Sequence, residues 1–202
     1  MKKIMFNDDY GLTQAVIEER KPMTRREVKG LARGVKDLRI NNGICEMLYE
    51  GATMWVTCNV QPKYKLGEVI AVAQRYRDIA GNHFFANELA ADELSVNGMK
   101  FEHGWNNKQG VKACYMPTRI RITDIKAERL QDISNEDCMK EGITKWNRGL
   151  NLYYFCEERF SDFNSPREAF AALIDKVSGK GTWERNPWVF AYTFELVKGG
   201  EL

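Results

Sequence analysis

This 202-residue chain has few histidines, no closely spaced cysteine pair and no long apolar run, and each of these features argues against a class of protein. Its two histidines, His83 and His103, do not form a close-spaced ligand set, so we expect no metal site. The cysteines form no C-x-x-C pair, which argues against a zinc knuckle or a disulfide framework and fits free thiols in a reducing compartment. They are scattered as Cys45, Cys58, Cys114, Cys138 and Cys156.

The start of the chain and its hydropathy predict a cytoplasmic protein. Lys2 and Lys3 resemble the beginning of a signal peptide, but Asn7, Asp8 and Asp9 arrive before an apolar region can form. No stretch approaches the roughly 20 apolar residues that a membrane-spanning helix needs. We therefore expect neither secretion nor a membrane partner.

Common phosphate and cofactor fingerprints are also missing. The chain has no G-x-x-x-x-G-K-[ST], G-x-G-x-x-G, G-x-S-x-G or H-E-x-x-H motif, so kinase, Rossmann and serine-hydrolase functions lack support and no cofactor is expected. The 30 Lys and Arg against 28 Asp and Glu give a net charge of only +2. A surface that attracts nucleic acid must therefore be local.

Three helices are predicted by periodicity and capping residues. The first covers residues 12–19. The second follows Ser134 as its cap and ends before Gly142, a residue type typical of a helix C-terminus. The third follows Ser165, with Pro166 at the first helical position.

The strand-like runs are short and do not alternate with helices in a βαβ rhythm. Strands are expected at residues 3–6, 54–60, 69–72, 120–125 with a bulge, and after the Asn186-Pro187 turn. A hairpin break is expected at Glu50-Gly51, whereas Gly30 and Gly34 argue for a loop or broken helix over 27–40. The pattern favours an α+β fold, a small mixed β-barrel with short flanking helices.

Residues 78–112 differ in character from the rest of the chain. They are rich in glycine and asparagine around one short helical pattern at 85–94. We expect a single domain over residues 1–202, with this segment as an insertion.

The stretch ERKPMTRREV, residues 19–28, is either a solvated basic turn or a pocket that makes a lysine lose its proton. A free lysine has a pKa of ~10.4 and is a poor base, but burial and nearby cations lower it. Thr24 offers a hydroxyl that can act as a nucleophile. In a straight strand Lys21 and Thr24 face opposite sides, so Lys21 must arrive from a turn, which Pro22 favours. The cations that could lower the lysine pKa are Arg20, Arg25 and Arg26.

Glu141 is a second candidate for chemistry. It lies in the last turn of the helix that Ser134 begins, where the helix dipole disfavours an anion by ~0.3 to 1 kcal/mol. A carboxylate at this position indicates a raised pKa or a cation partner. A solvated glutamate beside Gly142 is the alternative.

Two further features have both structural and functional explanations. Trp188, Phe190, Tyr192 and Phe194 alternate along the last strand, which is more typical of a barrel core than of a platform for stacking bases. Arg119 follows Met116-Pro117 and either contacts a phosphate or caps a strand edge.

Together, the segments ERKPMTRR, MPTRIRITDIKAERLQDISNEDCMKEGI and WERNPWVFAYTFELV resemble the ASCH domain family of the PUA-like superfamily. The first is similar to its G-x-K-x-x-T-x-R signature, and the others to its phage and prophage branch. The resemblance covers residues 1–30, 64–76, 116–143 and 165–197. It implies a PUA-like mixed β-barrel with a cleft that binds RNA or nucleotides.

Some small bacterial members with this signature hydrolyse the acyl amide of N4-acetylcytidine. Their catalytic lysine, threonine and glutamate fall on Lys21, Thr24 and Glu141 of this chain. Two residues depart from the family pattern: Glu19 replaces the signature glycine, and Gln74 stands where an acidic residue is usual.

The resemblance and the residues together predict a nucleoside-, nucleotide- or RNA-binding protein that is a metal-independent amidohydrolase on N4-acylated cytidine-type substrates. Lys21 would be the general base, Thr24 the attacking hydroxyl and Glu141 the proton shuttle. Arg20, Arg26, Gln74 and Arg119 are the candidates for substrate binding. Two alternatives stay open: a non-catalytic module for single-stranded RNA, and a prophage accessory protein that binds a protein partner.

Overall fold

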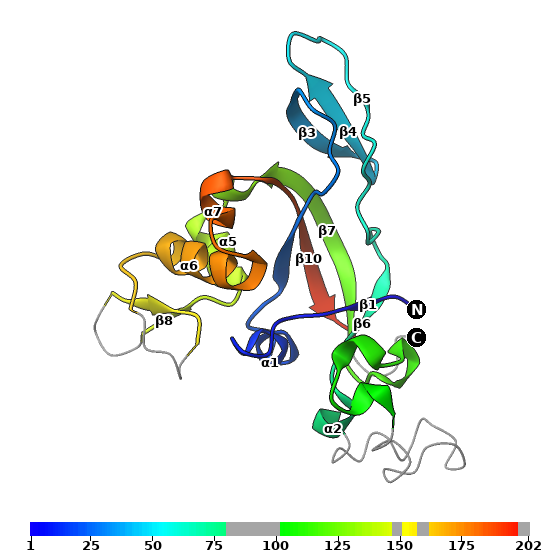
Figure 1. The fold of residues 1–202 in the computed structure, drawn as a ribbon, viewed down its shortest axis with the longest axis vertical. Coiled ribbons are helices and arrows are strands. Elements are labelled where there is room, and N and C mark those ends of the chain that lie inside the picture. The colour runs from blue at the N-terminus through cyan, green and yellow to red at the C-terminus, as the bar shows by residue number, and fades with distance from the viewer. Residues whose placement is uncertain (80–101, 147–150, 157–161, 198–202) are drawn as a thin grey trace.

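The computed structural model describes residues 1–79, 102–146, 151–156 and 162–197. Its central feature is a five-stranded sheet in the order β1-β6-β7-β10-β2, in which only β1 and β6 run parallel (Figure 1). The strands are β1 (Lys3–Ile4), β6 (Val69–Val72), β7 (Arg119–Arg129), β10 (Trp188–Leu196) and β2 (Met23–Glu27).

The long strands β7 and β10 carry the core. Trp188, Phe190, Tyr192 and Phe194 are all buried, which confirms their interpretation as core residues. Between Thr193 and Phe194 the register with β7 shifts, so that the partner of Thr193 is Asp124 and the partner of Phe194 is Ile122. This irregularity confirms the bulge expected among residues 120–125.

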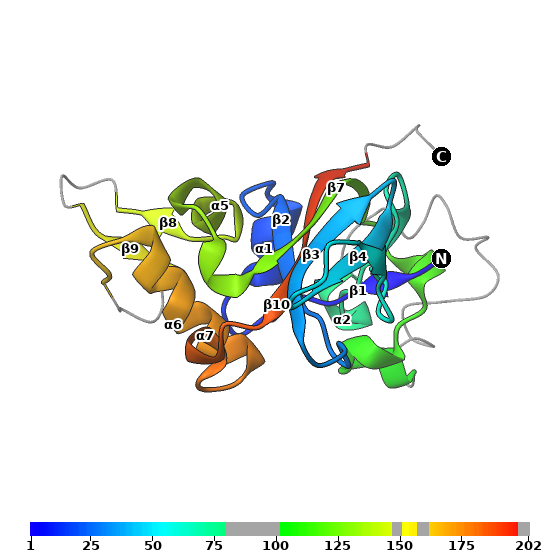
Figure 2. The same cartoon turned by 90° about the horizontal axis from the view of Figure 1, so that it is seen from above.

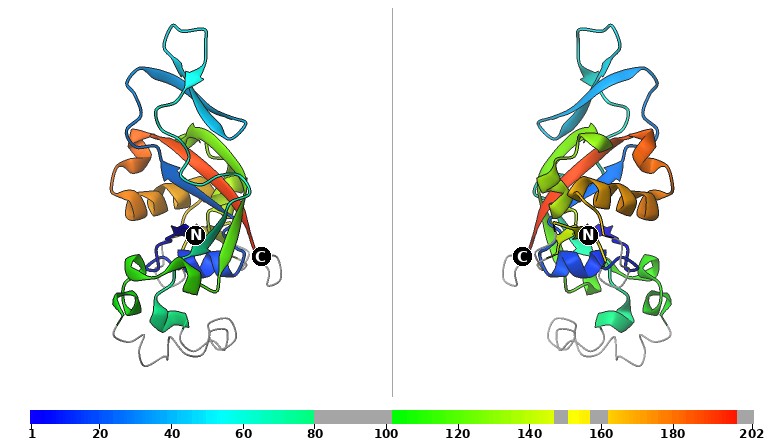
Figure 3. Two further views of the ribbon diagram at one scale, coloured as in Figure 1. Left: turned by 90° about the vertical axis from the view of Figure 1, so that its right-hand side faces the viewer. Right: turned by 90° about the vertical axis from the view of Figure 1, so that its left-hand side faces the viewer.

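A second sheet of three strands projects from one end of the molecule, as Figures 1 and 3 show. It consists of β3 (Val35–Asn41), β4 (Ile44–Tyr49) and β5 (Val56–Thr57). The expected loop is confirmed over residues 28–34, where Gly30 and Gly34 have positive φ. The expectation is wrong for residues 35–40, because β3 pairs with β4 through a tight turn at Asn42-Gly43. Both turn residues have positive φ, 49° and 77°, as a two-residue hairpin requires. β4 also pairs with β5, on the far side of Gly51.

Helices flank the central sheet on two sides. One group, α5 (Asn135–Lys140), α6 (Pro166–Ser178) and α7 (Thr182–Arg185), lies beyond β2, together with β8 (Thr144–Lys145) and β9 (Tyr153–Tyr154) (Figure 2). The hydroxyls of Ser134 and Ser165 accept hydrogen bonds from the backbone N–H of Asp137 and Glu168, which confirms both predicted caps. The expected N-terminal helix is α1 (Leu12–Ile17).

The second group of helices continues from β6. It comprises α2 (Tyr76–Ile79) and the 3₁₀ turns η1 (His103–Trp105), η2 (Lys108–Gly110) and η3 (Ala113–Tyr115); a further turn, η4 (Leu130–Asp132), follows β7. Most of the expected insertion at 78–112, including the helical pattern at 85–94, lies outside the described residues. The flanks that are described pack around a small core of Tyr76, Val111 and Met116.

The mixed α and β composition predicted from the sequence is confirmed, with mostly sheet and short helices. In the part of the chain that the structure describes, β1 and β2 form the two edges of the five-stranded sheet. Closure into a PUA-like barrel stays a prediction. Within the same residues, no helix is long and apolar enough to cross a membrane.

Candidate functional site

Lys21 enters the site from the turn between α1 and β2, as its sequence position requires. Its backbone N–H donates to the carbonyl of Ala15 at 2.9 Å, and the carbonyl of Pro22 accepts from Phe194 on β10. Two residues earlier, Glu19 has φ 59°, a left-handed conformation that favours glycine. The turn therefore has the backbone that a glycine at position 19 would suit, and Glu19 adopts it at a cost.

A buried ion pair joins this turn to the end of α5. The Lys21 ammonium lies 2.5 Å from Oε2 of Glu141 and 2.8 Å from its carbonyl oxygen. The two side chains are only 3% and 5% exposed. Glu141 is the C-cap residue of α5, where the helix dipole disfavours an anion. The expected cation partner of this carboxylate is therefore present, 120 residues away in the chain.

Arg25 was expected only as a cation that could lower the Lys21 pKa, and its ion pairs with acidic residues were not predicted from the sequence. Its guanidinium, 1% exposed, contacts Oε1 of Glu141 at 3.0 Å, Glu128 at 2.6 Å and Asp137 at 3.1 Å. Asp137 and Glu141 are four residues apart on α5, so the helix presents both carboxylates on one face. That spacing was the available signal for a cation between them.

Burial dominates the electrostatics of Lys21. Removal from water lowers the pKa of its amine below the ordinary 10.5, and the neighbouring charges of Arg26 and Arg25 lower it further. The carboxylate of Glu141 opposes these effects by its charge and its hydrogen bond. Burial likewise opposes the charge on Arg25, but Glu141 and Glu128 raise the pKa of its guanidinium overall. Arg25 therefore stays charged, whereas the lowered pKa of Lys21 makes its proton the easier one to remove.

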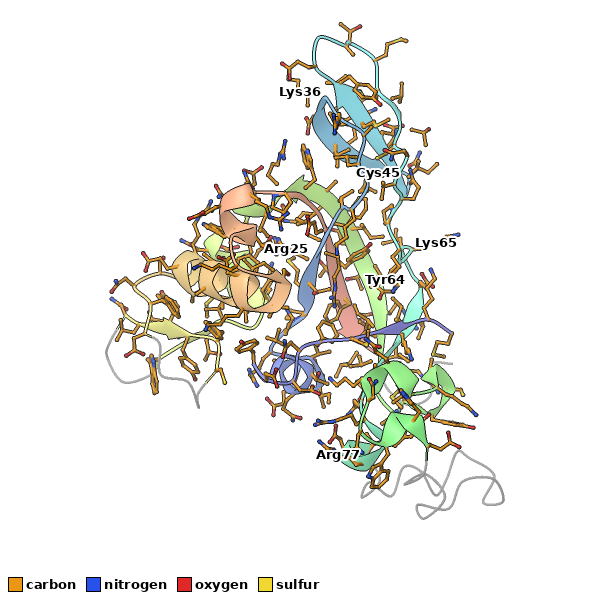
Figure 4. All side chains as sticks on the ribbon, viewed as in Figure 1. Arg25, Lys36, Cys45, Tyr64, Lys65 and Arg77 are labelled. Carbon is orange, nitrogen blue, oxygen red and sulfur yellow. The ribbon has the colours of Figure 1, made fainter. Side chains whose placement is uncertain are left out.

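Lys21, Thr24, Arg25, Arg26 and Glu141 all line one hollow of about 390 Å³, which we call the ion-pair cavity. Its size is within the range of small-molecule pockets. Figure 4 shows Arg25 between β2 and the group of helices α5, α6 and α7. The opposite wall is apolar and is formed by four side chains of α6: Phe170, Leu173, Ile174 and Val177.

The structure brings the three predicted catalytic residues to one cavity, but only one of the four predicted substrate-binding residues. Arg26 lines it, whereas Arg20 pairs with Glu18 at 2.6 Å on the exposed side of the turn. Gln74 follows β6 and Arg119 begins β7, beside the small core around Met116. Neither lines the ion-pair cavity, because the sheet order places β6 and most of β7 away from β2.

The described residues contain no group of three or more His, Cys, Asp or Glu that could hold a metal ion. The cavity can instead supply acid–base chemistry and hydrogen bonds. An ammonium has three donors, and Glu141 occupies two of those of Lys21, which leaves one for a ligand or for Thr24.

Comparison with known proteins found no matching family model, no matching curated protein and no matching solved structure.

Proposed function

We propose that the protein is an ASCH-type, PUA-like barrel that binds a nucleoside or nucleotide in the ion-pair cavity and hydrolyses an N4-acyl amide. One observation supports this proposal above the others. The buried Lys21–Glu141 pair lines the same cavity as Thr24. Burying two charges is costly, and strongly perturbed titratable groups in a cleft are candidates for function.

The pair can store and release one proton. Transfer from the Lys21 ammonium to Glu141 across 2.5 Å converts two buried charges into a neutral amine and a carboxylic acid. Burial favours the neutral amine of Lys21, which has a lone pair that can accept a proton. Arg25 keeps its contact with Oε1 and holds the carboxyl in place throughout.

Hydrolysis then takes place in two stages. The Lys21 amine accepts the Thr24 proton as the hydroxyl oxygen attacks the acyl carbonyl, and the C–N bond breaks as Glu141 gives its proton to the leaving amine. The acyl group is now an ester of Thr24. A water molecule attacks this ester with Glu141 as the base, releases the carboxylic acid and restores the threonine, and the ammonium–carboxylate pair forms again.

Turnover of N4-acetylcytidine by the purified protein tests the function. Lys21→Met, Thr24→Val and Glu141→Gln should each lower kcat by at least about 100-fold, because each removes a proton carrier or the nucleophile. Lys65→Ala is the matched control, since Lys65 is exposed and lies outside the cavity. No turnover across a panel of N4-acylated cytidines by the wild-type protein would contradict the enzyme.

The direction in which kcat changes with pH follows from the lowered pKa of Lys21. Because the mechanism needs one proton on the Lys21–Glu141 pair, kcat should stay level while the pair keeps that proton and should fall as pH rises through the Lys21 pKa, since Glu141 then has no proton to give to the leaving amine. The lowered pKa places this fall below pH 10.5. A profile from pH 6 to 10 measures it, and a rate that rises throughout this range would contradict the shared proton.

One observation favours a second function, binding of single-stranded RNA without catalysis. Glu141 opposes the loss of the Lys21 proton, and a permanently charged pair would serve as a fixed contact for a ligand. In that case RNA binds, its affinity falls with salt, and no acylated substrate turns over.

A further inference from the structure

A second hollow of about 500 Å³ adjoins the ion-pair cavity across β2, and we call it the basic cavity. The two share Met5, Arg26, Glu27 and Lys29, so the edge strand β2 is the wall between them. Figure 4 shows Tyr64, which lines the basic cavity, on the opposite side of β2 from Arg25. A ligand that crosses this wall contacts both hollows.

The basic cavity has an apolar floor and a cationic rim. Tyr64, Phe190 and Tyr192 form the floor, and the rings of Tyr64 and Tyr192 meet edge to face at 5.3 Å. The rim has four cations, Lys3, Arg26, Lys29 and Lys63, against the single carboxylate of Glu27. Glu27 contacts Arg185 at 3.3 Å, so its charge is already shared.

None of these four cations has a carboxylate partner among the described residues. The ammonium of Lys3 donates to the carbonyls of Gln109 and Val111, each at 2.7 Å, which leaves Arg26, Lys29 and Lys63 for a ligand. Arg26 is held in place by a hydrogen bond of 2.7 Å to the carbonyl of Met5 and by the Phe6 ring, whose centre is 5.6 Å away. A guanidinium has five N–H donors, so most remain for an anion. Lys63 lies 5.3 Å from the centre of the Tyr64 ring. Because the net charge of the whole chain is only +2, the excess of cations over carboxylates at this cavity is a local one.

We infer that the basic cavity is a second nucleotide subsite, which takes the phosphate and the adjoining nucleotide of a single-stranded nucleic acid. This inference rests on the proposed function, in which the first base occupies the ion-pair cavity. Arg26 and Lys29 contact the linking phosphate over β2, and Lys63 contacts the next phosphate. The apolar floor receives the flat face of the second base.

A free 5′-mononucleotide has the same phosphate chemistry, so ligand length distinguishes the two sources. The probes are cytidine, 5′-cytidine monophosphate, the dinucleotide CpC and a labelled oligocytidylate of about eight nucleotides, a typical site size. Affinity should rise from the mononucleotide to the dinucleotide and again to the oligomer. If the mononucleotide binds as tightly as the oligomer, the site holds a single phosphate and the inference is overturned.

Lys63→Ala is the decisive variant, because it removes a rim cation that does not touch the ion-pair cavity. Oligomer affinity should fall about threefold to tenfold, and the slope of log K against log salt should decrease by about one. Lys65→Ala removes an equal charge outside both cavities and should leave affinity and slope unchanged. Equal effects of the two substitutions would overturn the subsite.

The two proposals fail separately in this design. If Lys63→Ala weakens the oligomer while no N4-acylated cytidine turns over, the subsite stands and the hydrolase is wrong. If N4-acetylcytidine turns over in both Lys63→Ala and Lys65→Ala but oligomer binding does not depend on Lys63, the hydrolase stands and the subsite is wrong. Both lysines are exposed, so both variants should fold, and circular dichroism with urea unfolding tests this.

Discussion

Glu141 accepts hydrogen bonds from two buried cations, Lys21 through Oε2 and Arg25 through Oε1. Removing it leaves the Lys21 ammonium buried without a carboxylate partner among the described residues, whereas Arg25 keeps Glu128 and Asp137. Removing Lys21 instead leaves Glu141 paired with Arg25. Loss of Glu141 should therefore lower the free energy of unfolding more than loss of Lys21.

Glu141→Ala should lower the free energy of unfolding by about 3 to 5 kcal/mol, as for other broken buried pairs. Lys21→Met should cost less. The lowered lysine pKa means that the folded state binds this proton less tightly than the unfolded state, so below the folded-state pKa the group opposes folding. Urea unfolding at pH 7 measures both variants, and a greater loss for Lys21→Met would contradict this account.

Glu19 offers a separate test of backbone strain in the turn before Lys21. A non-glycine residue at φ 59° is strained, so Glu19→Gly should raise the unfolding free energy by about 1 kcal/mol. Glu19→Ala removes the same charge but keeps a Cβ, and we expect no comparable gain. Thermal and urea unfolding distinguish them, and an equal gain in both variants would assign the effect to charge.

At the scale of elements, α5 and α6 are each followed by a glycine with positive φ, so the same substitution can be compared at the two helix ends. Gly142 and Gly179 have φ 100° and 105°, so alanine at either position should cost about 1 to 2 kcal/mol. A Cβ on Gly142 would lie 3.6 Å from Cδ of Lys21, whereas a Cβ on Gly179 would have nothing within 4 Å.

Only Gly142→Ala should therefore change the chemistry of the site. A shift of this backbone moves the Glu141 carbonyl and the Lys21 side chain that it holds. Turnover and its pH profile should change in Gly142→Ala and stay at the wild-type level in Gly179→Ala, with urea unfolding as the stability reference. Loss of turnover in both would indicate general destabilisation.

At the scale of the molecule, Lys108 ties the segment around η2 to the N-terminal elements. Its ammonium contacts the carbonyl of Phe6 at 3.1 Å, the hydroxyl of Thr13 at 2.7 Å and the carboxylate of Asp8. These contacts join residues about 100 positions apart in the chain. Because Phe6 and Leu12 line the ion-pair cavity, this link supports one wall of the site.

Lys108→Met should lower the unfolding free energy by about 1 to 3 kcal/mol, because two part-buried acceptors, the Phe6 carbonyl and the Thr13 hydroxyl, lose their donor. Amide hydrogen exchange should then become faster in residues 3–17 and in 103–115 together, since the tie holds both. Lys112→Met is the control, an exposed lysine in the same segment. Faster exchange in only one of the two segments would show that they are not coupled.

Local sequence signals determined much of the fold. Ser134, Ser165 and Pro166 predicted where α5 and α6 begin, because capping depends on neighbouring backbone groups. Alternation predicted the buried aromatic face of β10 for the same local reason. The Asn42-Gly43 hairpin was also a local signal, but the loop that Gly30 and Gly34 correctly indicated was extended to residue 40, where β3 forms instead.

Charge pairing was decided by tertiary structure alone. The sequence indicated that Glu141 needs a cation at a helix C-terminus, and that Lys21 must leave a turn to reach Thr24. It could not show that Arg25, rather than Arg20, turns inward, because strand register and the packing of α5 on β2 decide which arginine meets Glu128, Asp137 and Glu141. Helix ends and strand faces follow from neighbours in the chain, whereas the partner of a buried charge follows from which distant elements are packed together.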